Sequence, residues 1–269
     1  MRLSSTLMAG CTAMLLLSVP AATGAQQTAP AAPVLGAPNV DQDSLAALER
    51  MGAALRARNI FVLTADITDE DVLNSGEKLQ FAGTIEIRAK RPDRFKVSIM
   101  SDIKDRQIYY DGKQLTVYAP VLGVYGQFAA PATIAQTLRA ARERYDIELP
   151  LADLFTWGTD ESAASKLTSG FLVRPEHVGG KACDHYAFRQ ENVDWQIWIA
   201  AEGEALPCKL VITNTEDPSR PQYTAVLRWN FPNVLAEDVF AFKPPSRDVN
   251  KIVIVDMAPA QAQTKGATK

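Results

Sequence analysis

The sequence predicts a mainly β protein of the α+β class, built on one large antiparallel sheet that curls into a half-barrel. Apolar and polar residues alternate with a period of two through ten or eleven short segments, which is typical of strands with one buried face. Nearly all of these segments are joined by short turns, as in antiparallel meanders. Because an open sheet of this length must curl, we expect an apolar concave face that helices cover.

The first 25 residues have the anatomy of a secretory signal peptide. Arg2 precedes an apolar run at residues 14–20 that is too short to span a bilayer, and small residues follow as far as Ala25. We therefore expect an exported protein that does not span the membrane after signal removal. Lipoprotein anchoring at Cys11 is the alternative. The main apolar run follows this cysteine instead of preceding it, which argues against anchoring.

The mature chain is expected to hold one folded domain between two poorly ordered ends. Residues 26–42 are rich in Ala and Pro and predict a linker, and residues 257–269 predict a disordered tail. The domain between them, residues 43–256, is long enough to bury a sizeable core.

A helix is expected at the start of the domain, followed by a first meander. Leucines and Met51 recur at three- and four-residue spacing through residues 43–58, and Asp43 or Ser44 would cap this helix. A turn signal at Asp111-Gly112 predicts a tight hairpin. The expected strands of this half lie at residues 61–67, 81–88, 94–99, 107–110 and 113–118.

A helical insert interrupts the strand pattern, and a second meander completes the sheet. Pro131 would open the insert at the first position of a helix, Leu151–Trp157 is a short and strongly apolar second segment, and Ser162–Leu167 predicts a further turn. The expected strands of the second half lie at residues 170–174, 182–190, 194–200, 207–214, 222–231 and 251–255.

Cys183 and Cys208 remain after signal removal, and export favours a disulfide between them. In a regular meander they would start the two outer strands, about 10 Å apart, whereas a disulfide needs Cα atoms within about 7 Å. A bridge therefore requires one cysteine to leave the regular sheet. A metal site at Cys183, Asp184 and His185 is the alternative. It lacks zinc-type spacing, and adjacent side chains on a strand point to opposite faces, so no metal is predicted.

Composition and motifs argue against two function classes. The chain has 28 basic and 31 acidic side chains, so no basic excess exists to neutralise nucleic-acid phosphates. It contains two histidines and lacks a nucleophile elbow, a zinc-protease motif and a phosphate-binding glycine loop. We therefore predict no catalytic residues, no cofactor and no enzyme activity.

Five stretches of the domain carry a resemblance, and they are Lys90–Phe95, Tyr110–Lys113, Leu149–Phe155, Asp194–Ile199 and Phe240–Pro245. Taken in order, they resemble a family of predicted periplasmic proteins of unknown function that is grouped with the LolA-like lipoprotein carriers. This resemblance implies a periplasmic location and an unclosed antiparallel β-barrel with a helical lid and an apolar cavity. It further implies that the ligand is a lipid or an acylated lipoprotein.

Two sets of residues are candidates for ligand binding. Apolar side chains of the Leu151–Trp157 segment would form the lid, and apolar side chains on the concave face would line the cavity. Three basic residues near one turn, Arg91, Arg94 and Lys96, would meet a lipid headgroup or an acidic partner, unless they form a solvated strand face. The apolar candidates are Phe95, Val97, Ile99, Leu151, Leu154, Phe155, Trp157, Trp195, Ile197, Tyr223, Leu227 and Trp229.

Two functions of different classes follow from this pattern. The first is a non-catalytic periplasmic carrier or sensor that binds lipid or lipoprotein acyl chains in a hollow concave face. The second is a protein–protein interaction module of the cell envelope, in which the same apolar residues form a filled core. Alternation along the strands predicts the apolar face in both cases and leaves the choice open.

Overall fold

The computed structural model describes residues 39–101, 105–157, 159 and 166–257. The predicted signal peptide with Cys11, the linker as far as residue 38, the tail from residue 258 and most of the turn expected at Ser162–Leu167 lie outside the described residues. The linker was predicted too long, because Asn39–Val40 already forms a strand and the first helix begins at Gln42.

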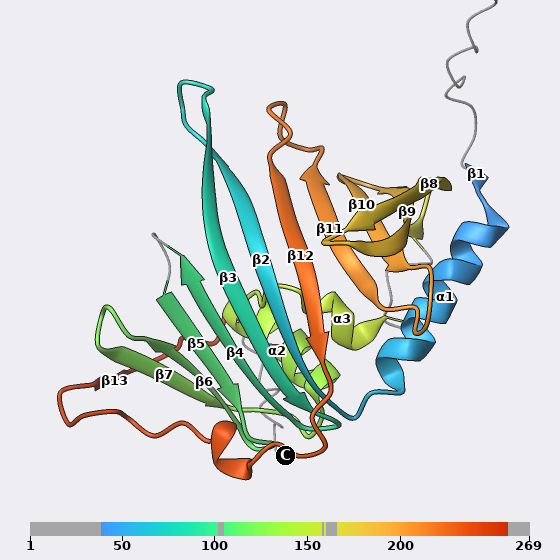
Figure 1. Cartoon of the computed structure of the whole chain (residues 1–269). Helices are drawn as coiled ribbons and strands as arrows, with labels where there is room; N and C mark the ends of the chain where they lie inside the picture. The colour runs from blue at the N-terminus through green and yellow to red at the C-terminus, as the bar shows by residue number, and fades with distance from the viewer. Residues whose placement is uncertain (1–38, 102–104, 158, 160–165, 258–269) are drawn as a thin grey trace, which may run out of the picture. The chain divides into compact units, whose positions relative to one another are not determined.

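The described residues contain 13 strands, which form one sheet, and few helices (Figure 1). The strands are β1 (Asn39–Val40), β2 (Ile60–Val72), β3 (Lys78–Lys90), β4 (Arg94–Ser101), β5 (Asp105–Tyr110), β6 (Gln114–Ala119), β7 (Val124–Ala129), β8 (Ser169–Val178), β9 (Lys181–Gln190), β10 (Val193–Ala200), β11 (Pro207–Asn214), β12 (Gln222–Asn230) and β13 (Asn250–Ile252). The helices are α1 (Gln42–Arg56), α2 (Ile134–Tyr145), α3 (Asp153–Thr156) and the short 3-10 helix η2 (Glu237–Val239).

The sheet consists of two antiparallel meanders that meet along one seam. Its order is β1-β8-β9-β10-β11-β12-β2-β3-β4-β5-β6-β7-β13, so β12 joins the second meander to the first strand of the first. The predicted large antiparallel sheet is confirmed. It differs from the prediction at its two edges, where β1 pairs with β8 and β13 pairs with β7 in parallel. The last strand is also shorter than the predicted run at residues 251–255.

Two predicted helix starts were wrong, because a residue with extended backbone takes the cap position in each case. Asp41 precedes α1, and its carboxylate accepts a hydrogen bond from the Asp43 backbone N–H at 3.2 Å. Thr133 precedes α2, and its hydroxyl accepts from the Gln136 N–H at 3.3 Å. Pro131 lies outside α2, where its carbonyl accepts a hydrogen bond from the Tyr110 hydroxyl at 2.5 Å.

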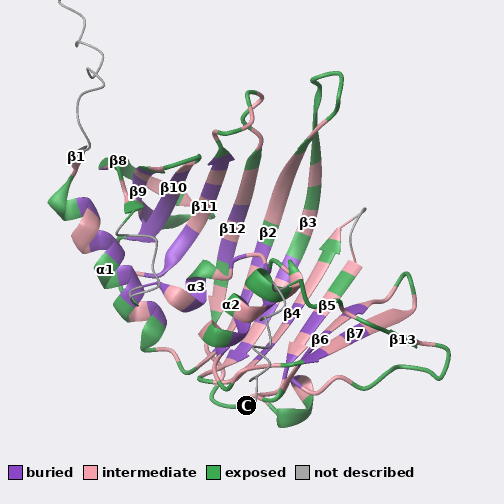
Figure 2. Ribbon diagram, turned by 180° about the vertical axis from the view of Figure 1, so that it is seen from behind, coloured by how far each residue is buried: buried purple, intermediate pink, exposed green. Residues whose placement is uncertain are grey.

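The concave face carries the core, as the alternation predicted. Leu63, Ala65, Ile85, Ile87 and Val97 are each at most 1% exposed. Figure 2 shows buried residues on the strand face that the helices cover, and both views place α2 and α3 on that side of the sheet. Each fully buried large apolar side chain contributes roughly 1.5–3 kcal/mol to stability. The apolar stripe of α1 joins the same cluster as the strands and the lid segment.

The C-terminal segment wraps from the convex face to the lid side. Phe242 packs on the convex face with its ring centroid 4.9–5.4 Å from those of Tyr109, Tyr118 and Tyr125. After β13, Asp256 pairs with Arg144 of α2, and the Met257 N–H donates to the Arg144 carbonyl at 2.6 Å. The segment therefore ties α2 to the far edge of the sheet, beyond the predicted domain end at residue 256.

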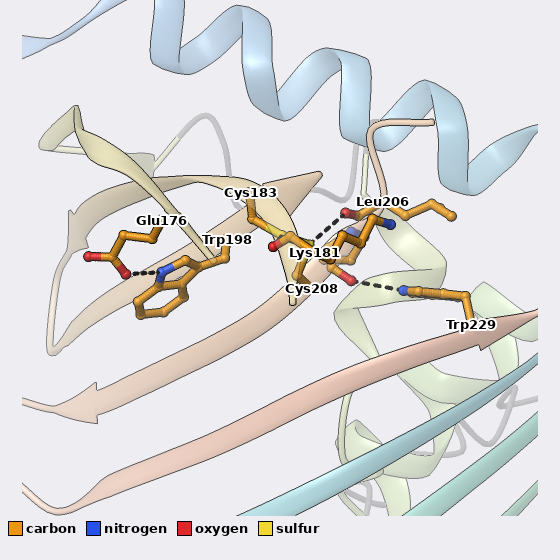
Figure 3. The surroundings of a disulfide bond; sticks show 8 residues. Glu176, Lys181, Cys183, Trp198, Leu206, Cys208 and Trp229 are labelled. Carbon is orange, nitrogen blue, oxygen red and sulfur yellow. Dashed lines mark hydrogen bonds between the residues drawn. A yellow bond between two sulfur atoms is a disulfide. The ribbon is translucent and has the colours of Figure 1, made fainter. Parts of the chain in front are cut away.

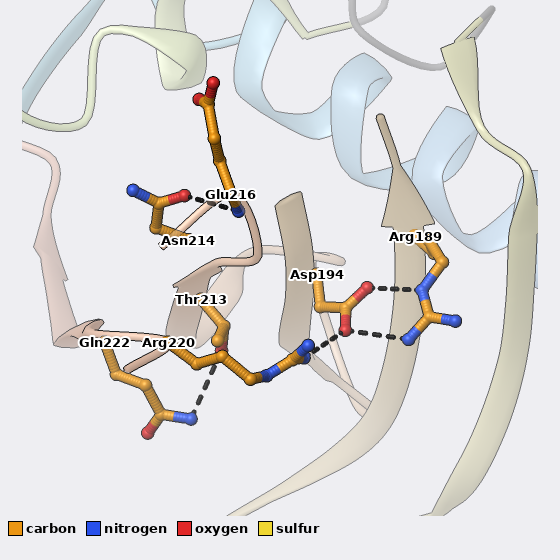
Figure 4. Close-up of polar contacts among 7 residues, drawn as sticks. All are labelled: Arg189, Asp194, Thr213, Asn214, Glu216, Arg220 and Gln222. Carbon is orange, nitrogen blue, oxygen red and sulfur yellow. Dashed lines mark hydrogen bonds and ion pairs between the residues drawn. The ribbon is translucent and has the colours of Figure 1, made fainter. Parts of the chain in front are cut away.

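Ion pairs on the convex face join neighbouring hairpins (Figure 4). Asp194 on β10 accepts hydrogen bonds from Arg189 on β9 at 2.6 and 2.8 Å and from Arg220 in the β11–β12 turn at 2.7 Å. These hydrogen bonds, led by that from Arg189, hold the pKa of Asp194 below its usual value. The contacts are partly exposed, and we assign them to the alignment of the hairpins and not to ligand binding.

The disulfide forms between Cys183 and Cys208, with Cα atoms 6.9 Å apart, although β10 separates the two strands that carry them (Figure 3). The pairing register of β10 with β11 shifts at this place, since Trp198 is opposite Lys209 and Ile199 is opposite Pro207. Cys208 is therefore the extra residue of a β-bulge. The bulge is the departure from the regular sheet that the distance argument required.

Removing this disulfide is expected to lower the free energy of unfolding by about 3 kcal/mol, because the bridge closes a loop across 25 residues and restricts the unfolded chain. The measurement is urea unfolding of the Cys183→Ala/Cys208→Ala variant beside the oxidised protein. Reduced wild-type protein serves as the control and should unfold with the variant. Equal stability of the variant and the oxidised protein would contradict this expectation.

Candidate functional site

Two cavities lie between the lid segment and the concave face. The larger has a volume of about 450 Å³ and lies beneath the residues that connect α2 to α3. The smaller has a volume of about 200 Å³ and lies between α3 and strands β10, β11 and β12. The two cavities share four bordering residues, which are Leu151, Asp153, Ile212 and Tyr223. The half-barrel is therefore filled at one end and hollow at the other.

Aromatic side chains fill the closed end. Phe155 from the lid packs against Phe61 and Phe95, with ring centroids 5.7 and 6.1 Å apart. Phe95 also contacts Tyr110 at 5.4 Å, and Trp229 contacts Phe61 at 5.6 Å. Such pairs add roughly 0.5–1.5 kcal/mol each beyond the area they bury. This cluster anchors one end of the lid to the sheet.

Two arginines hold the lid backbone from either side. Arg56, at the end of α1, donates to the Trp157 carbonyl at 3.0 Å, and Arg91 donates to the Phe155 carbonyl at 3.4 Å. The Arg91 guanidinium also lies 5.5 Å from the centroid of the Phe155 ring. Burial and then the nearby charge of Arg56 lower the pKa of Arg91. The α3 helix is too short to persist without such contacts.

The first residue of the lid segment has a strained backbone conformation and borders both cavities. Leu151 has a φ of 60°, which is uncommon for a side chain that is not glycine. Its side chain is only 8% exposed and borders both cavities. The contacts of this buried side chain therefore compensate for an unfavourable backbone conformation at the place where the lid meets the hollow.

The predicted apolar residues all face the concave side, and the structure divides them into two groups. Phe95, Val97, Phe155 and Trp229 belong to the filled core and border neither cavity. The others border one cavity or both. They are Ile99, Leu151, Leu154, Trp157, Trp195, Ile197, Tyr223 and Leu227.

Several cavity residues were missing from the predicted set. Ile67, Phe81 and Ile85 continue the alternation of β2 and β3, and the period-two pattern that identified their neighbours applies to them equally. Leu210 and Ile212 on β11 follow the same pattern. Leu138 and Ile147 border the larger cavity from α2 and the residues after it. No pattern in the strands could have identified these two, because they come from the helical insert.

The three basic candidates do not form one site. Arg91 lies under the lid, whereas Arg94 pairs with Glu237 at 2.8 Å. The Lys96 ammonium lies 5.0 Å from the ring centroid of Tyr109 on the convex face. Arg91 is therefore separated from Arg94 and Lys96, which share the convex face of β4, and the three do not form a joint headgroup site.

Asp153 is a charged group at the cavity border. Desolvation by the protein atoms around it raises its pKa, and the charge of Arg142 opposes this shift. Arg142 also pairs with Glu148 at 3.6 Å, and all three residues border the larger cavity. The polar side of this cavity thus contains both signs of charge.

A second polar group lies on the convex face beside the disulfide (Figure 3). Trp198 donates from Nε1 to Glu176 at 2.7 Å, and the His185 ring stacks on Trp198 with centroids 3.9 Å apart. The hydrogen bond from Trp198 is the main reason that the pKa of Glu176 falls to about 2. In the described part of the chain, no three His, Cys, Asp or Glu side chains form a group suited to a metal ion.

The geometry defines an unclosed antiparallel half-barrel with a helical lid and a largely apolar, partly open cavity between them. The chain belongs to the family described as "Predicted periplasmic protein (DUF2092)", which matches residues 45–255. This confirms the predicted membership of a family of predicted periplasmic proteins, and the protein is periplasmic. Among the described residues, no helix combines the length and apolar character needed to cross a bilayer. No curated protein matches the chain in sequence.

Solved structures show distant similarity to the chain. MucB matches with a TM-score of 0.41 and 15% identity, over 76% of this chain and 64% of MucB, so the chain spans less than two thirds of that protein. The lipoprotein LppX of Mycobacterium tuberculosis matches with a TM-score of 0.46 and 12% identity, over 73% of this chain and 100% of LppX. A LolA superfamily protein of Nitrosomonas europaea matches with a TM-score of 0.36 and 10% identity, over 74% and 97% of the two chains.

Replacing Arg91 with Ala is expected to loosen the lid, because the Phe155 carbonyl loses its hydrogen bond and the ring loses its cation contact. Hydrogen exchange of the Phe155 and Trp157 amides should accelerate, while exchange in β3 and β4 stays unchanged. Arg88→Ala is the matched control, since Arg88 pairs with Glu86 and does not contact the lid. Unchanged exchange in Arg91→Ala would show that the lid is held without this residue.

Replacing Asp153 with Asn is expected to stabilise the protein at neutral pH. The folded-state pKa lies above the ordinary value of 3.8, so the folded state binds more protons and stability falls as pH rises through this window. The Tm of the variant should exceed that of the wild type at pH 7, and the two should converge at a pH below 3.8. A difference in Tm that does not vary with pH would contradict this assignment.

Proposed function

We propose that the protein binds a lipid, or the acyl chain of a lipoprotein, beneath its lid and acts as a non-catalytic carrier or sensor in the periplasm. The observation that supports this proposal is the cavity of about 450 Å³, which falls within the usual range of roughly 300–1,000 Å³ for small-molecule sites. A second, smaller cavity adjoins it. Aliphatic and aromatic side chains make up most of both walls.

An acyl chain matches the chemistry of these walls. Each methylene group that leaves water for an apolar site gains about 0.8 kcal/mol, and the bound chain requires no catalytic group. The apolar wall comes from both sides of the sheet seam and from the lid. Its members are Ile67, Ile85, Ile99, Ile108, Leu151, Leu154, Trp157, Trp195, Ile197, Leu210, Ile212 and Leu227.

The lid provides a route for entry and release. Its backbone is held by the two arginine hydrogen bonds and by the Phe155 cluster, not by continuous secondary structure. If these contacts open together, Leu154, Phe155 and Trp157 leave the concave face and both cavities become accessible. Binding of an apolar ligand would compensate for the exposure of these side chains to water.

A protein-partner role is the second candidate, and one surface favours it. Phe171, Leu172 and Val173 on β8 are 51%, 45% and 41% exposed, which places three consecutive apolar residues at the surface. Within the described residues, β1 pairs with β8 only at Ser169 and Gly170, so the rest of this edge has no neighbouring strand. A partner protein that adds a strand would use this edge.

The decisive experiment is organic extraction and native mass spectrometry of protein purified from the periplasm, together with titration of a fluorescent fatty acid. Co-purified lipid and saturable probe binding are expected. Absence of both would reject the lipid-binding proposal. Crosslinking in cells that captured only proteins, through the β8 edge, would then favour the second candidate.

A substitution that fills the larger cavity is expected to weaken ligand binding. Ile99→Trp places a large side chain in the larger cavity and should weaken probe binding at least about tenfold, because the ligand would have to displace it. Met100→Trp is the matched control, since Met100 is the next residue on β4, is 60% exposed and points to the other face. Both variants are first checked for folding by their Tm. Equal loss of binding in both variants would contradict the assigned site.

A further inference from the structure

Resting on the proposed function, we propose that the Tyr223 hydroxyl binds the carbonyl oxygen of an ester- or amide-linked acyl chain and so determines the orientation of the ligand. The part of the acyl chain next to the carbonyl then occupies the smaller cavity, and the polar part of the ligand occupies the larger one. Three observations carry this assignment: the different walls of the two cavities, the position of Tyr223 between them and the state of its hydroxyl group.

The smaller cavity is the more apolar of the two. Among the described residues of its wall, polar side chains come from Asp153, Gln190 and Tyr223, and the others are apolar. The indoles of Trp157 and Trp195 pack together there, with ring centroids 5.4 Å apart. A hydrocarbon chain fits this wall, whereas a charged or zwitterionic head would lose its hydration without replacement.

The larger cavity has a polar side. In addition to apolar residues, its described border contains five charged side chains of both signs, from strands β2 and β5, from α2 and the connection that follows it, and from α3. A polar head group would find donors and acceptors on this side. The charged residues are Asp69, Arg106, Arg142, Glu148 and Asp153.

Tyr223 stands at the boundary between these two surroundings. It lies on β12 opposite Asp69 of β2, and its side chain borders both cavities. The hydroxyl oxygen is buried and has no hydrogen-bond partner within the described part of the chain. Buried hydroxyl groups nearly always have a partner, so an unpaired one beside a cavity is typical of a place where the ligand supplies it.

The Tyr223 hydroxyl can donate a hydrogen bond and does not ionise. Desolvation, followed by the nearby charge of Asp69, raises the pKa of Tyr223. The phenol therefore stays protonated at the pH of the periplasm and offers one O–H donor. A carbonyl oxygen is the acceptor that an ester- or amide-linked acyl chain places between its hydrocarbon tail and its head. The carbonyl group would therefore lie at the boundary between the cavities, with the hydrocarbon tail on one side and the head group on the other.

The test compares two probes that differ in this carbonyl. Palmitoyl lysophosphatidylcholine has an ester carbonyl, and its ether analogue, 1-O-hexadecyl lysophosphatidylcholine, has a chain of equal length and the same glycerol and head group without one. We expect Tyr223→Phe to bind the first probe about five- to tenfold more weakly than wild type, the loss that one neutral hydrogen bond produces. Its affinity for the second probe should stay unchanged. Tyr109→Phe is the matched control, because that hydroxyl bonds to Gln107 on the convex face.

Each outcome decides one question. Equal affinity of Tyr223→Phe and wild type for the ester probe overturns the carbonyl assignment while lipid binding itself stands. An equal loss for both probes also overturns it, because the hydroxyl then acts on cavity shape and not on the carbonyl. Failure of the wild-type protein to bind either probe rejects the proposed function instead. The Tm of Tyr223→Phe should be at least that of wild type, because the substitution removes an unpaired buried hydroxyl and no hydrogen bond.

Discussion

The pairing of β12 with β2 is the interaction on which the rest of the structure depends. It joins the end of the second meander to the start of the first through eight register pairs, from Tyr223 opposite Asp69 to Asn230 opposite Val62. Arg228 and Asp66 form an ion pair across this seam although 162 residues separate them in the chain. Without the seam there would be two separate sheets, and neither would have a continuous concave face.

Single strands contribute both to the filled core and to the cavity wall. On β2 the concave face runs from Phe61 to Ile67, and on β4 it runs from Phe95 to Ile99. Large aromatic side chains therefore fill one end of the half-barrel together with Phe155 of the lid. Further along the same strands, Ile67 and Ile99 border the larger cavity. The same alternation along a strand thus produces both a core and a cavity.

Prediction from the sequence was accurate where the signal was local. Most strand segments, the concave face and the lid segment followed from the period of the pattern and from short turns, whereas β1 and β7 were not predicted. The predicted helix caps were wrong because the cap position depends on backbone conformation, which the apolar pattern does not indicate. Asp41 and Thr133 have an extended backbone and occupy these positions. Arg91, Arg94 and Lys96 are close in sequence, but the turn and the strand direct them to different surroundings.

The sequence by itself determined the class of fold, the apolar face, the lid and the family, because alternation and motif order are properties of short stretches. It also limited the disulfide to one pair of cysteines. Only the tertiary structure decided that a bulge at Cys208 brings this pair together, and that Phe95 fills the core while Ile99 borders a cavity. It alone revealed the unpaired hydroxyl of Tyr223. These features depend on packing between residues far apart in the chain, which no local pattern contains.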